Sequence, residues 1–454
     1  MAEALVVKDL QVHFHTRRGV YKALNGANLT LHRSEVLGVA GESGCGKSTL
    51  GLTVMGLLPR NAEIPTGQVI LQNMDLVNLQ TQYSKQVAGR FSPKKNEKLL
   101  RRVNKAMEKL RGFRVSMVFQ EPMTSLNPVL QVGFQVAETV YVHSPALLAQ
   151  RALARFKATP EDMRAIVRLL QPGGDAGESA VRAYAKEHGL EGIEEQVFFL
   201  WRRPDIHVVR KEKTILAMGG EAIHTFARNV LERVAATGMI PFEMRVTPVL
   251  ARRVKKVLMK EGYRKAEELL TSLGIPHAER VVKMYPHELS GGMRQRVVIA
   301  IALANNPEVV VMDEPTSAVD VTVQAQILEL VKQIRTAVNA TFIVISHDLS
   351  VLSEVCDRIA IMYAGRVVEV GPMDKVLANP LHPYTQLLIS AIPTLEGNQI
   401  AGITGEIPDM RAPPSGCSFH PRCPFAFEKC KTDVPVDLPY EGGRTVDCWL
   451  YEGK

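Results

Sequence analysis

The chain has 454 residues, 46% of them hydrophobic, which is enough for two or three domains that each bury a core. It has no apolar run near the ~18 residues that span a bilayer, and its first residues lack the basic-then-apolar pattern of a signal peptide, so we expect a cytoplasmic protein. The net charge of +8 is local rather than general, because residues 81–114 alone hold eleven Lys and Arg against two Glu.

Short apolar bursts between residues 4 and 31 predict antiparallel strands near the start of the chain. Aromatic residues on such strands are suited to stacking on an adenine ring. Phe14 is the first candidate for this role and Tyr21 the second. The competing interpretation is that these rings belong to the core.

A glycine-rich loop lies between an apolar run at residues 36–40 and a helical run at residues 50–58. Strand, loop and helix in this order bind polyphosphates, because backbone N–H groups at a helix N-terminus surround the anion. Lys47 is placed to reach the β- and γ-phosphates, and Ser48 to ligate Mg²⁺. The predicted nucleotide-binding residues of the loop are Gly41, Ser43, Gly44, Cys45, Gly46, Lys47, Ser48 and Thr49.

The basic segment at residues 81–114 contains Ser92-Pro93 as a helix start and apolar positions on one helical face. Three interpretations are open: a solvated basic helix, a surface near anionic lipid headgroups, or a nucleic-acid contact. No aromatic residues are interleaved with the charges, which disfavours nucleic acid as a partner.

Two stretches further along the chain suit phosphate chemistry. A strand over residues 115–119 ends at Gln120, whose amide is suited to ligating a metal or ordering a water. Downstream, Ser290, Gly291 and Gly292 open a helix, which makes a second anion-binding helix start.

Carboxylates and a histidine follow two further apolar strands. The strand at residues 309–312 ends in Asp313 and Glu314. In nucleotide hydrolysis the first carboxylate holds Mg²⁺, and the second orients and deprotonates the attacking water. The next strand, at residues 342–346, ends at His347, which is suited to contacting a γ-phosphate.

In this order the motifs resemble those of the nucleotide-binding subunits of ATP-binding cassette (ABC) transporters. The resemblance implies an α/β fold: a P-loop NTPase core of the RecA-like type, an antiparallel β subdomain and a helical subdomain that carries the signature, residues 289–292. In that family two subunits enclose two ATP molecules, so the signature of each completes the site of the other. The implied catalytic residues are Gln120, Glu314 and His347; the implied Mg²⁺ ligands are Ser48, Gln120 and Asp313; and Asp320, in the D-loop at residues 317–320, is implied to contact nucleotide.

A narrower resemblance is to the oligopeptide and dipeptide importer branch. It implies an ATPase at the cytoplasmic face of the membrane that powers peptide uptake through two integral permeases. A second ATPase subunit, a different paralogue, and an extracytoplasmic substrate-binding protein would complete the complex. Relatives in this branch carry oligosaccharides or nickel, so these substrates remain alternatives. The segments that carry the resemblance are residues 121–128, 285–288, 381–385 and 416–430.

The stretch between Gln120 and Ser290 is much longer than in these importers, which predicts an insertion. Helical periodicity broken by glycine pairs predicts a mainly helical segment, either a surface elaboration or a partner-binding element. The predicted parts are residues 1–143 and 259–375 for the ATPase core, 144–258 for the insertion and 376–454 for the C-terminal extension.

Non-transport ABC ATPases are the alternative from a different class. Chromosome-maintenance and DNA-repair ATPases also insert a segment between these motifs, but theirs are long coiled coils. The segment here is short, broken by glycines and free of cysteine, which disfavours that interpretation. A translation-associated or regulatory cassette protein is the other alternative.

Four of the six cysteines, Cys417, Cys423, Cys430 and Cys448, crowd the last forty residues among prolines and glycines. A tail of this composition buries little core, so another element must order it. Four thiolates suit a Zn²⁺ ion or an iron–sulfur cluster, and disulfides or free thiols are the other interpretations. The resemblance to the importer branch implies a [4Fe-4S] cluster, with Zn²⁺ as the alternative.

Overall fold

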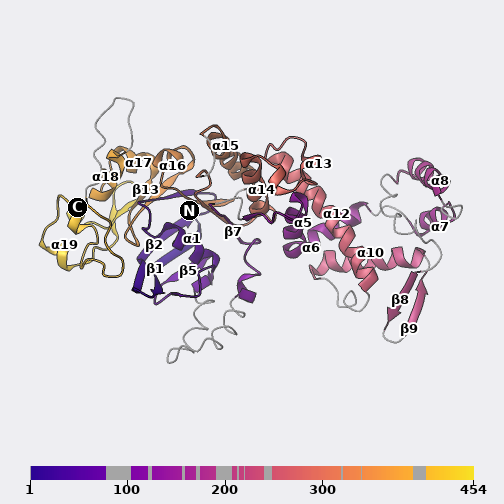
Figure 1. The fold of residues 1–454 in the computed structure, drawn as a ribbon, viewed down its shortest axis with the longest axis horizontal. Helices are drawn as coiled ribbons and strands as arrows, with labels where there is room; N and C mark the ends of the chain where they lie inside the picture. The colour runs from indigo at the N-terminus through magenta and orange to yellow at the C-terminus, as the bar shows by residue number, and fades with distance from the viewer. Residues whose placement is uncertain are drawn as a thin grey trace. The chain divides into compact units, whose positions relative to one another are not determined.

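The protein is described by a computed structural model (Figure 1). It forms two compact units, residues 1–126 with 290–454, and residues 127–289. Most of the basic segment, residues 81–103, lies outside the described residues, as do residues 121–124 and Asp320. None of the described helices has an apolar stretch long enough to cross a bilayer. The described residues are 2–77, 104–120, 125–155, 159–169, 174–190, 207–211, 214–218, 220–239, 248–317, 321–338, 340–391 and 405–453.

The first unit is built on an eight-stranded sheet with the strand order β14-β15-β13-β12-β3-β11-β10-β7. Its parallel strands are β7 (Val115–Val118), β10 (Val309–Asp313), β11 (Thr341–Ile345), β3 (Val36–Ala40) and β12 (Arg358–Tyr363). β3, β10 and β11 are buried throughout, as expected of parallel strands covered on both faces. Their carboxyl ends lie side by side, so the loops that follow them meet at one edge of the sheet.

The other edge of this sheet is antiparallel. β13 (Arg366–Pro372) pairs with β12, and β15 (Arg444–Val446) and β14 (Leu438–Tyr440) extend the sheet beyond it. Strands from the end of the chain therefore join the same sheet as the glycine-rich loop.

A second, antiparallel sheet confirms the strands predicted between residues 4 and 31. β1 (Glu3–Thr16) pairs with β2 (Gly19–His32) along their length, and on its other edge with β5 (Gln68–Leu71) and β4 (Ala62–Glu63). β6 (Met74–Asp75) follows β5. The inward-facing residues of β1, including Leu5 and Val12, join one hydrophobic core with β3 and β10 of the larger sheet.

Helix α1 (Lys47–Met55) begins directly after the glycine-rich loop. Leu50 and Val54 are buried in the core shared by the two sheets, which fixes the helix start relative to β3. Further helices of this unit before the C-terminal extension include α14 (Gly291–Leu303), α15 (Val321–Val338), α16 (Leu349–Val355) and α17 (Met373–Ala378).

In its described residues the second unit is mainly helical, with one β-hairpin. Helices at residues 145–155, 160–169 and 220–237 agree with the mainly helical segment that the sequence predicts. Where α5 (Val132–His143) contacts α12 (Pro248–Ser272), a Cβ on Gly262 would lie 2.8 Å from Cβ of Ala137, so close packing of these helices requires glycine. The elements are α5 (Val132–His143), α6 (Pro145–Arg155), α7 (Pro160–Leu169), α8 (Gly174–Glu187), β8 (His207–Lys211), β9 (Thr214–Met218), α10 (Gly220–Thr237), α12 (Pro248–Ser272), α13 (Ala278–Val281) and η2 (Pro286–Glu288).

The C-terminal extension packs on the end of β13. The buried carboxylate of Glu369 accepts hydrogen bonds from the backbone N–H groups of Leu381 and His382 at the start of α18 (Pro383–Ser390). Tyr451 donates to the carbonyl of Leu381, which ties the end of the chain to the same point. The remaining elements are η3 (His420–Arg422), α19 (Glu428–Thr432) and η4 (Trp449–Tyr451).

Candidate nucleotide-binding site

The glycine-rich loop turns tightly between β3 and α1, and at two positions the turn leaves no room for a side chain. Gly41 and Gly46 have φ values of 150° and 107°, in the region that favours glycine. A Cβ on Gly41 would lie 2.1 Å from the carbonyl oxygen of Met362, and one on Gly46 would lie 2.6 Å from that of Ala23. The glycines thus allow the loop to close onto β12 and β2.

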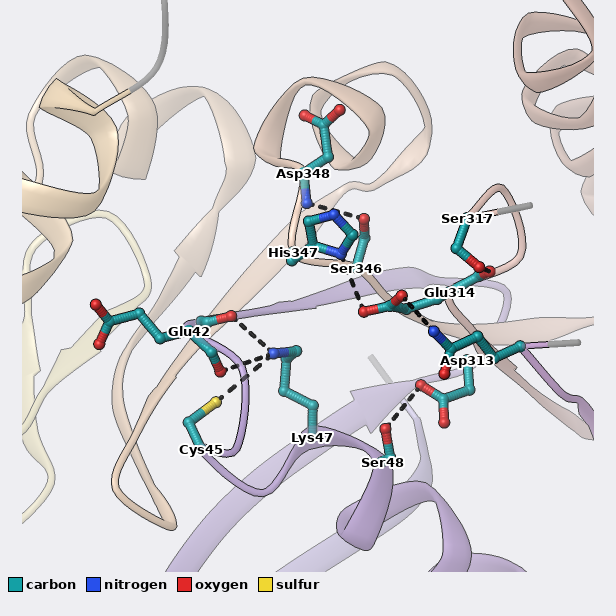
Figure 2. Close-up of polar contacts among 12 residues, drawn as sticks. Glu42, Cys45, Lys47, Ser48, Asp313, Glu314, Ser317, Ser346, His347 and Asp348 are labelled. Atoms are coloured by element: carbon teal, nitrogen blue, oxygen red, sulfur yellow. Dashed lines mark hydrogen bonds and ion pairs between the residues drawn. The ribbon is translucent and has the colours of Figure 1, made fainter. Parts of the chain in front are cut away.

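Lys47 is held inside this loop. Its side chain is buried, and Nζ donates to the carbonyl oxygens of Gly41 at 2.7 Å and Glu42 at 3.0 Å (Figure 2). An ammonium group held by two carbonyl oxygens stands at the loop centre as a positive charge, where a phosphate would bind.

The first carboxylate after β10 faces the start of α1. Ser48 Oγ donates to Asp313 Oδ1 at 3.1 Å (Figure 2). Burial raises the pKa of Asp313, and the charge of Glu314 adds to this, while the Ser48 hydrogen bond and Lys47 lower it. A buried carboxylate beside a hydroxyl is a pair of oxygen ligands of the kind that Mg²⁺ prefers.

Two of the three predicted catalytic residues, Gln120 and His347, converge on the carboxylate of the third, Glu314. Glu314 Oε2 accepts from Gln120 Nε2 at 3.0 Å, and Glu314 Oε1 lies 3.0 Å from His347 Nδ1 (Figure 2). Glu314 itself has φ +47°, which turns it away from the strand direction of β10. The loops after β7, β10 and β11 thus contribute one side chain each. Because the Gln120 amide nitrogen points at Glu314, its role as a metal ligand stays a prediction.

Ser290 caps α14, as its place before two glycines predicts. Its Oγ accepts a hydrogen bond from the N–H of Met293 at 3.3 Å, and a Cβ on Gly291 would meet no atom within 4 Å. The first turn of α14 is therefore open on this side, and its role towards a second subunit stays a prediction.

Sequence reasoning missed Gln295, one turn further along α14. The side chain is buried, and Nε2 donates to the carbonyl of Pro315 at 2.8 Å. This bond ties the signature helix to the residue after Glu314. A glutamine on a helix of this composition gave no signal in the sequence.

The two aromatic candidates face different neighbours. Phe14 is partly buried and packs on the core of the first unit. Tyr21 lies opposite it in the β1–β2 register, and its hydroxyl donates to the carbonyl of Gly44 at 3.3 Å. Tyr21, the second choice, is thus the one that contacts the glycine-rich loop, and adenine stacking by Phe14 stays a prediction.

The four clustered cysteines line one pocket, together with His382 and Trp449. None of them is in a disulfide. Burial, with a contribution from the neighbouring thiols, raises the pKa of Cys417 to about 11 and of Cys448 to about 12. In the part of the chain that the structure describes, no group of three or more Cys, His, Asp or Glu is arranged to hold a single metal ion.

The glycine-rich loop also receives two contacts from the C-terminal extension that sequence spacing did not indicate. Glu42 is bound by the hydroxyl of Tyr384 through its backbone and by Arg422 through its carboxylate. These partners are 342 and 380 positions away in the sequence, too far for any local pattern to pair them.

Comparison with known proteins matches residues 24–197 and 205–317 to the family described as ABC transporter, and residues 368–430 to the oligopeptide/dipeptide transporter C-terminal region. The oligopeptide transport ATP-binding protein AppD of Bacillus subtilis is 32% identical over 456 residues, covering 100% of this chain and 98% of that protein. The dipeptide transport ATP-binding protein DppD of the same organism is 30% identical, covering 100% and 96%. The oligopeptide transport ATP-binding protein OppD of Haemophilus influenzae is 31% identical, covering 100% and 99%.

Proposed function

Because this chain belongs to the ABC transporter family, we propose that it is the ATP-hydrolysing subunit of an importer for dipeptides or oligopeptides. The observation that carries the ATPase assignment is the convergence of Gln120 and His347 on Glu314, beside the Ser48–Asp313 pair. The peptide assignment is supported by the C-terminal region match and by the names of the relatives.

The residues divide the hydrolysis of ATP between them. Lys47 and the loop N–H groups hold the phosphates, and Ser48 and Asp313 would hold Mg²⁺, which when bound neutralises charge on the β- and γ-phosphates. Glu314 accepts a proton from the attacking water. The oxygen of that water bonds to the γ-phosphorus while the bond between the γ-phosphorus and ADP breaks. Gln120 and His347 hold the Glu314 carboxylate in position.

The partners follow from the proposed import function. We infer two integral permease subunits, a second ABC ATPase of a different paralogue that closes over the nucleotide, and an extracytoplasmic substrate-binding protein. The open first turn of α14 after Ser290 is supporting geometry for a second nucleotide contacted from this side. The chain would then work at the cytoplasmic face of the membrane.

A [4Fe-4S] cluster is the proposed group at the four cysteines. The four thiols line one pocket, and burial raises the pKa of Cys417 and Cys448, so these two stay protonated near neutral pH unless a cation binds them. A cluster takes one thiolate on each of four irons, so the sulfurs need not converge on one point as four zinc ligands must. Cys417, Cys423, Cys430 and Cys448 would be its ligands.

Chemical analysis tests the cluster directly. Protein purified without oxygen should be brown and contain close to four iron and four sulfide per chain. Cys423→Ser should lose the iron, and Cys45→Ser, in the glycine-rich loop, is the matched control that should retain it. Stoichiometric zinc without iron would reject the cluster and support the alternative.

The import function is tested by isolation of the chain from its native membrane with its partners. We expect two permeases and a second ATPase in the preparation, and ATP-dependent uptake of labelled peptide once the complex is placed in liposomes with its binding protein. Uptake of an oligosaccharide or nickel in place of peptide would assign the alternative substrates. Association with ribosomes and not with membrane would overturn the proposal.

A further inference from the structure

We propose that Arg422 and Tyr384 of the C-terminal extension are positioning residues for the ATP-binding loop, and that they link its affinity for ATP to the order of the four-cysteine site. This inference rests on the proposed ATPase function and names a way of regulating that same site. It concerns contacts within the first unit only.

Arg422 and Tyr384 both bind Glu42. Arg422 binds the Glu42 carboxylate with both terminal nitrogens, Nη1 to Oε2 at 3.0 Å and Nη2 to Oε1 at 3.2 Å. The side chain of Arg422 is only 5% exposed, and that of Glu42 is 20% exposed. A bidentate, charge-assisted pair with this burial fixes orientation as well as distance. The backbone N–H of Glu42 donates to the Tyr384 hydroxyl at 2.9 Å, so both parts of the residue are held.

Glu42 helps to hold Lys47 in the glycine-rich loop. It directly follows Gly41, and the carbonyls of both residues accept from Lys47 Nζ. Moving Glu42 therefore moves one acceptor of the lysine that is placed to bind phosphate. Arg422 therefore acts on Lys47 through Glu42.

Arg422 is connected to the cysteines through the backbone of η3, of which it is the last residue. The N–H of the next residue, Cys423, donates to the carbonyl of His420 at 3.3 Å, and the N–H of His420 donates to the carbonyl of Cys417 at 3.0 Å. These bonds make residues 417–423 one tight turn that carries two of the four thiols at its ends. Loss of order at either cysteine therefore displaces the guanidinium between them.

Aromatic packing makes the connection between Arg422 and the glycine-rich loop rigid. Phe419, in the middle of this turn, is 1% exposed and meets Tyr363 edge-on with ring centroids 5.1 Å apart. Tyr384 packs against both rings, at 4.6 Å from Tyr363 and 5.5 Å from Phe419. Tyr363 also accepts from Arg422 Nη1 at 3.3 Å. The turn, the aromatic cluster and the loop therefore move as one body.

The test measures ATP affinity of the full-length chain together with iron content. Arg422→Gln should weaken ATP binding about tenfold, as expected for loss of a bidentate charged pair, with iron retained. Arg422→Lys should restore part of the affinity. Tyr384→Phe, which removes one hydroxyl, should weaken binding in the same direction without unfolding the chain. Arg335→Gln is the matched control, because it removes another Arg–carboxylate pair of the same compact unit, the pair with Asp357, and should leave binding unchanged.

Two comparisons separate a positioning role from general destabilisation. Arg422→Gln combined with Glu42→Gln should bind ATP no more weakly than either single variant, since both remove the same pair. Hydrolysis by Arg422→Gln should show a raised KM for ATP with kcat little changed. Additive losses in the double variant, or unchanged ATP affinity in Arg422→Gln, would overturn the inference.

The link to the cysteines has its own arm. Cys423→Ser should weaken ATP binding in the wild-type background but add nothing in Arg422→Gln, whereas unchanged affinity in Cys423→Ser would overturn the link. An iron-free wild-type chain would reject the proposed cluster, and the Arg422 comparison would still decide the present inference. The two proposals therefore fail separately.

Discussion

The hydroxyl of Ser48 donates a hydrogen bond to the carboxylate of Asp313 across 3.1 Å, although 265 positions separate the two residues. Parallel pairing brings them together, because β3 and β10 both flank β11 and end at the same edge of the sheet. Strand order thus brings together the pair proposed to bind Mg²⁺.

Replacing Lys47 tests the proposed phosphate-binding loop. Lys47→Ala removes the one ammonium group that the loop carbonyls hold, so we expect ATP affinity to fall about 10- to 100-fold, the range for losing a charged hydrogen bond. Equilibrium binding of labelled ATP measures this, with Lys332→Ala on the surface of α15 as the control. Equal affinity in both variants would remove Lys47 from the site.

The insertion is the second test. Joining Val142 to Ala251 removes most of residues 144–258, and every nucleotide motif lies outside the removed stretch, in the other compact unit except for Leu289 at the start of the signature. We expect ATP affinity to be unchanged, and the helical unit to unfold at a lower temperature because α12 loses its contacts with α6 and α10. A folded chain without ATP binding would show that the insertion builds part of the site. Retained ATP binding with failure to assemble with permeases would identify it as a partner-binding element.

The α5–α12 contact gives a third test. Helix propensity alone favours Gly262→Ala by about 1 kcal/mol, but the new Cβ would meet Ala137 at 2.8 Å. We therefore expect net destabilisation, of about 1–3 kcal/mol for overpacking. Denaturant unfolding should show it, and Lys260→Ala on the exposed side of α12 is the control. A stabilised Gly262→Ala chain would contradict the close packing.

Much of the site was predictable because its motifs are local. The composition around the loop from Gly41 to Ser48 predicts the strand before it and the helix after it, and the carboxylates at Asp313 and Glu314 mark the end of a predicted strand. The convergence of Gln120 and His347 on Glu314 depends on which strands are neighbours, which composition does not encode. Resemblance to a known family supplied that order. Arg422 had no such aid, because its partner Glu42 lies 380 positions away and neither residue belongs to a phosphate-binding pattern.

Asp447 gives a pH-dependent test. Burial raises its pKa to about 8, a hydrogen bond and the charge of Asp437 add to the effect, and Arg366 opposes it. The folded chain therefore keeps a proton that the unfolded chain loses near the ordinary value of 3.8, so this residue makes stability fall as pH rises from about 4 to about 8. Asp447→Asn should remove this slope and be more stable than the wild type near pH 8.

Thermal unfolding from about pH 5 to about pH 9 measures the difference between the two chains. Asp409→Asn is the control, because Arg411 lowers the pKa of Asp409 to about 2, which places its titration below this range. An Asp447→Asn chain that loses stability with pH as steeply as the wild type would show that Asp447 is not the group responsible.

The proposed mechanism assigns to Glu314 the proton of the water that hydrolyses ATP, and Glu314→Gln in the assembled complex, assayed for steady-state hydrolysis, is its decisive test. ATP binding, measured in parallel, should be retained because the loop from Gly41 to Ser48 is intact, and Glu354→Gln on α16 serves as the control. We expect turnover to fall roughly 10²- to 10⁴-fold, the contribution of a general base. Near-wild-type turnover in Glu314→Gln would contradict it.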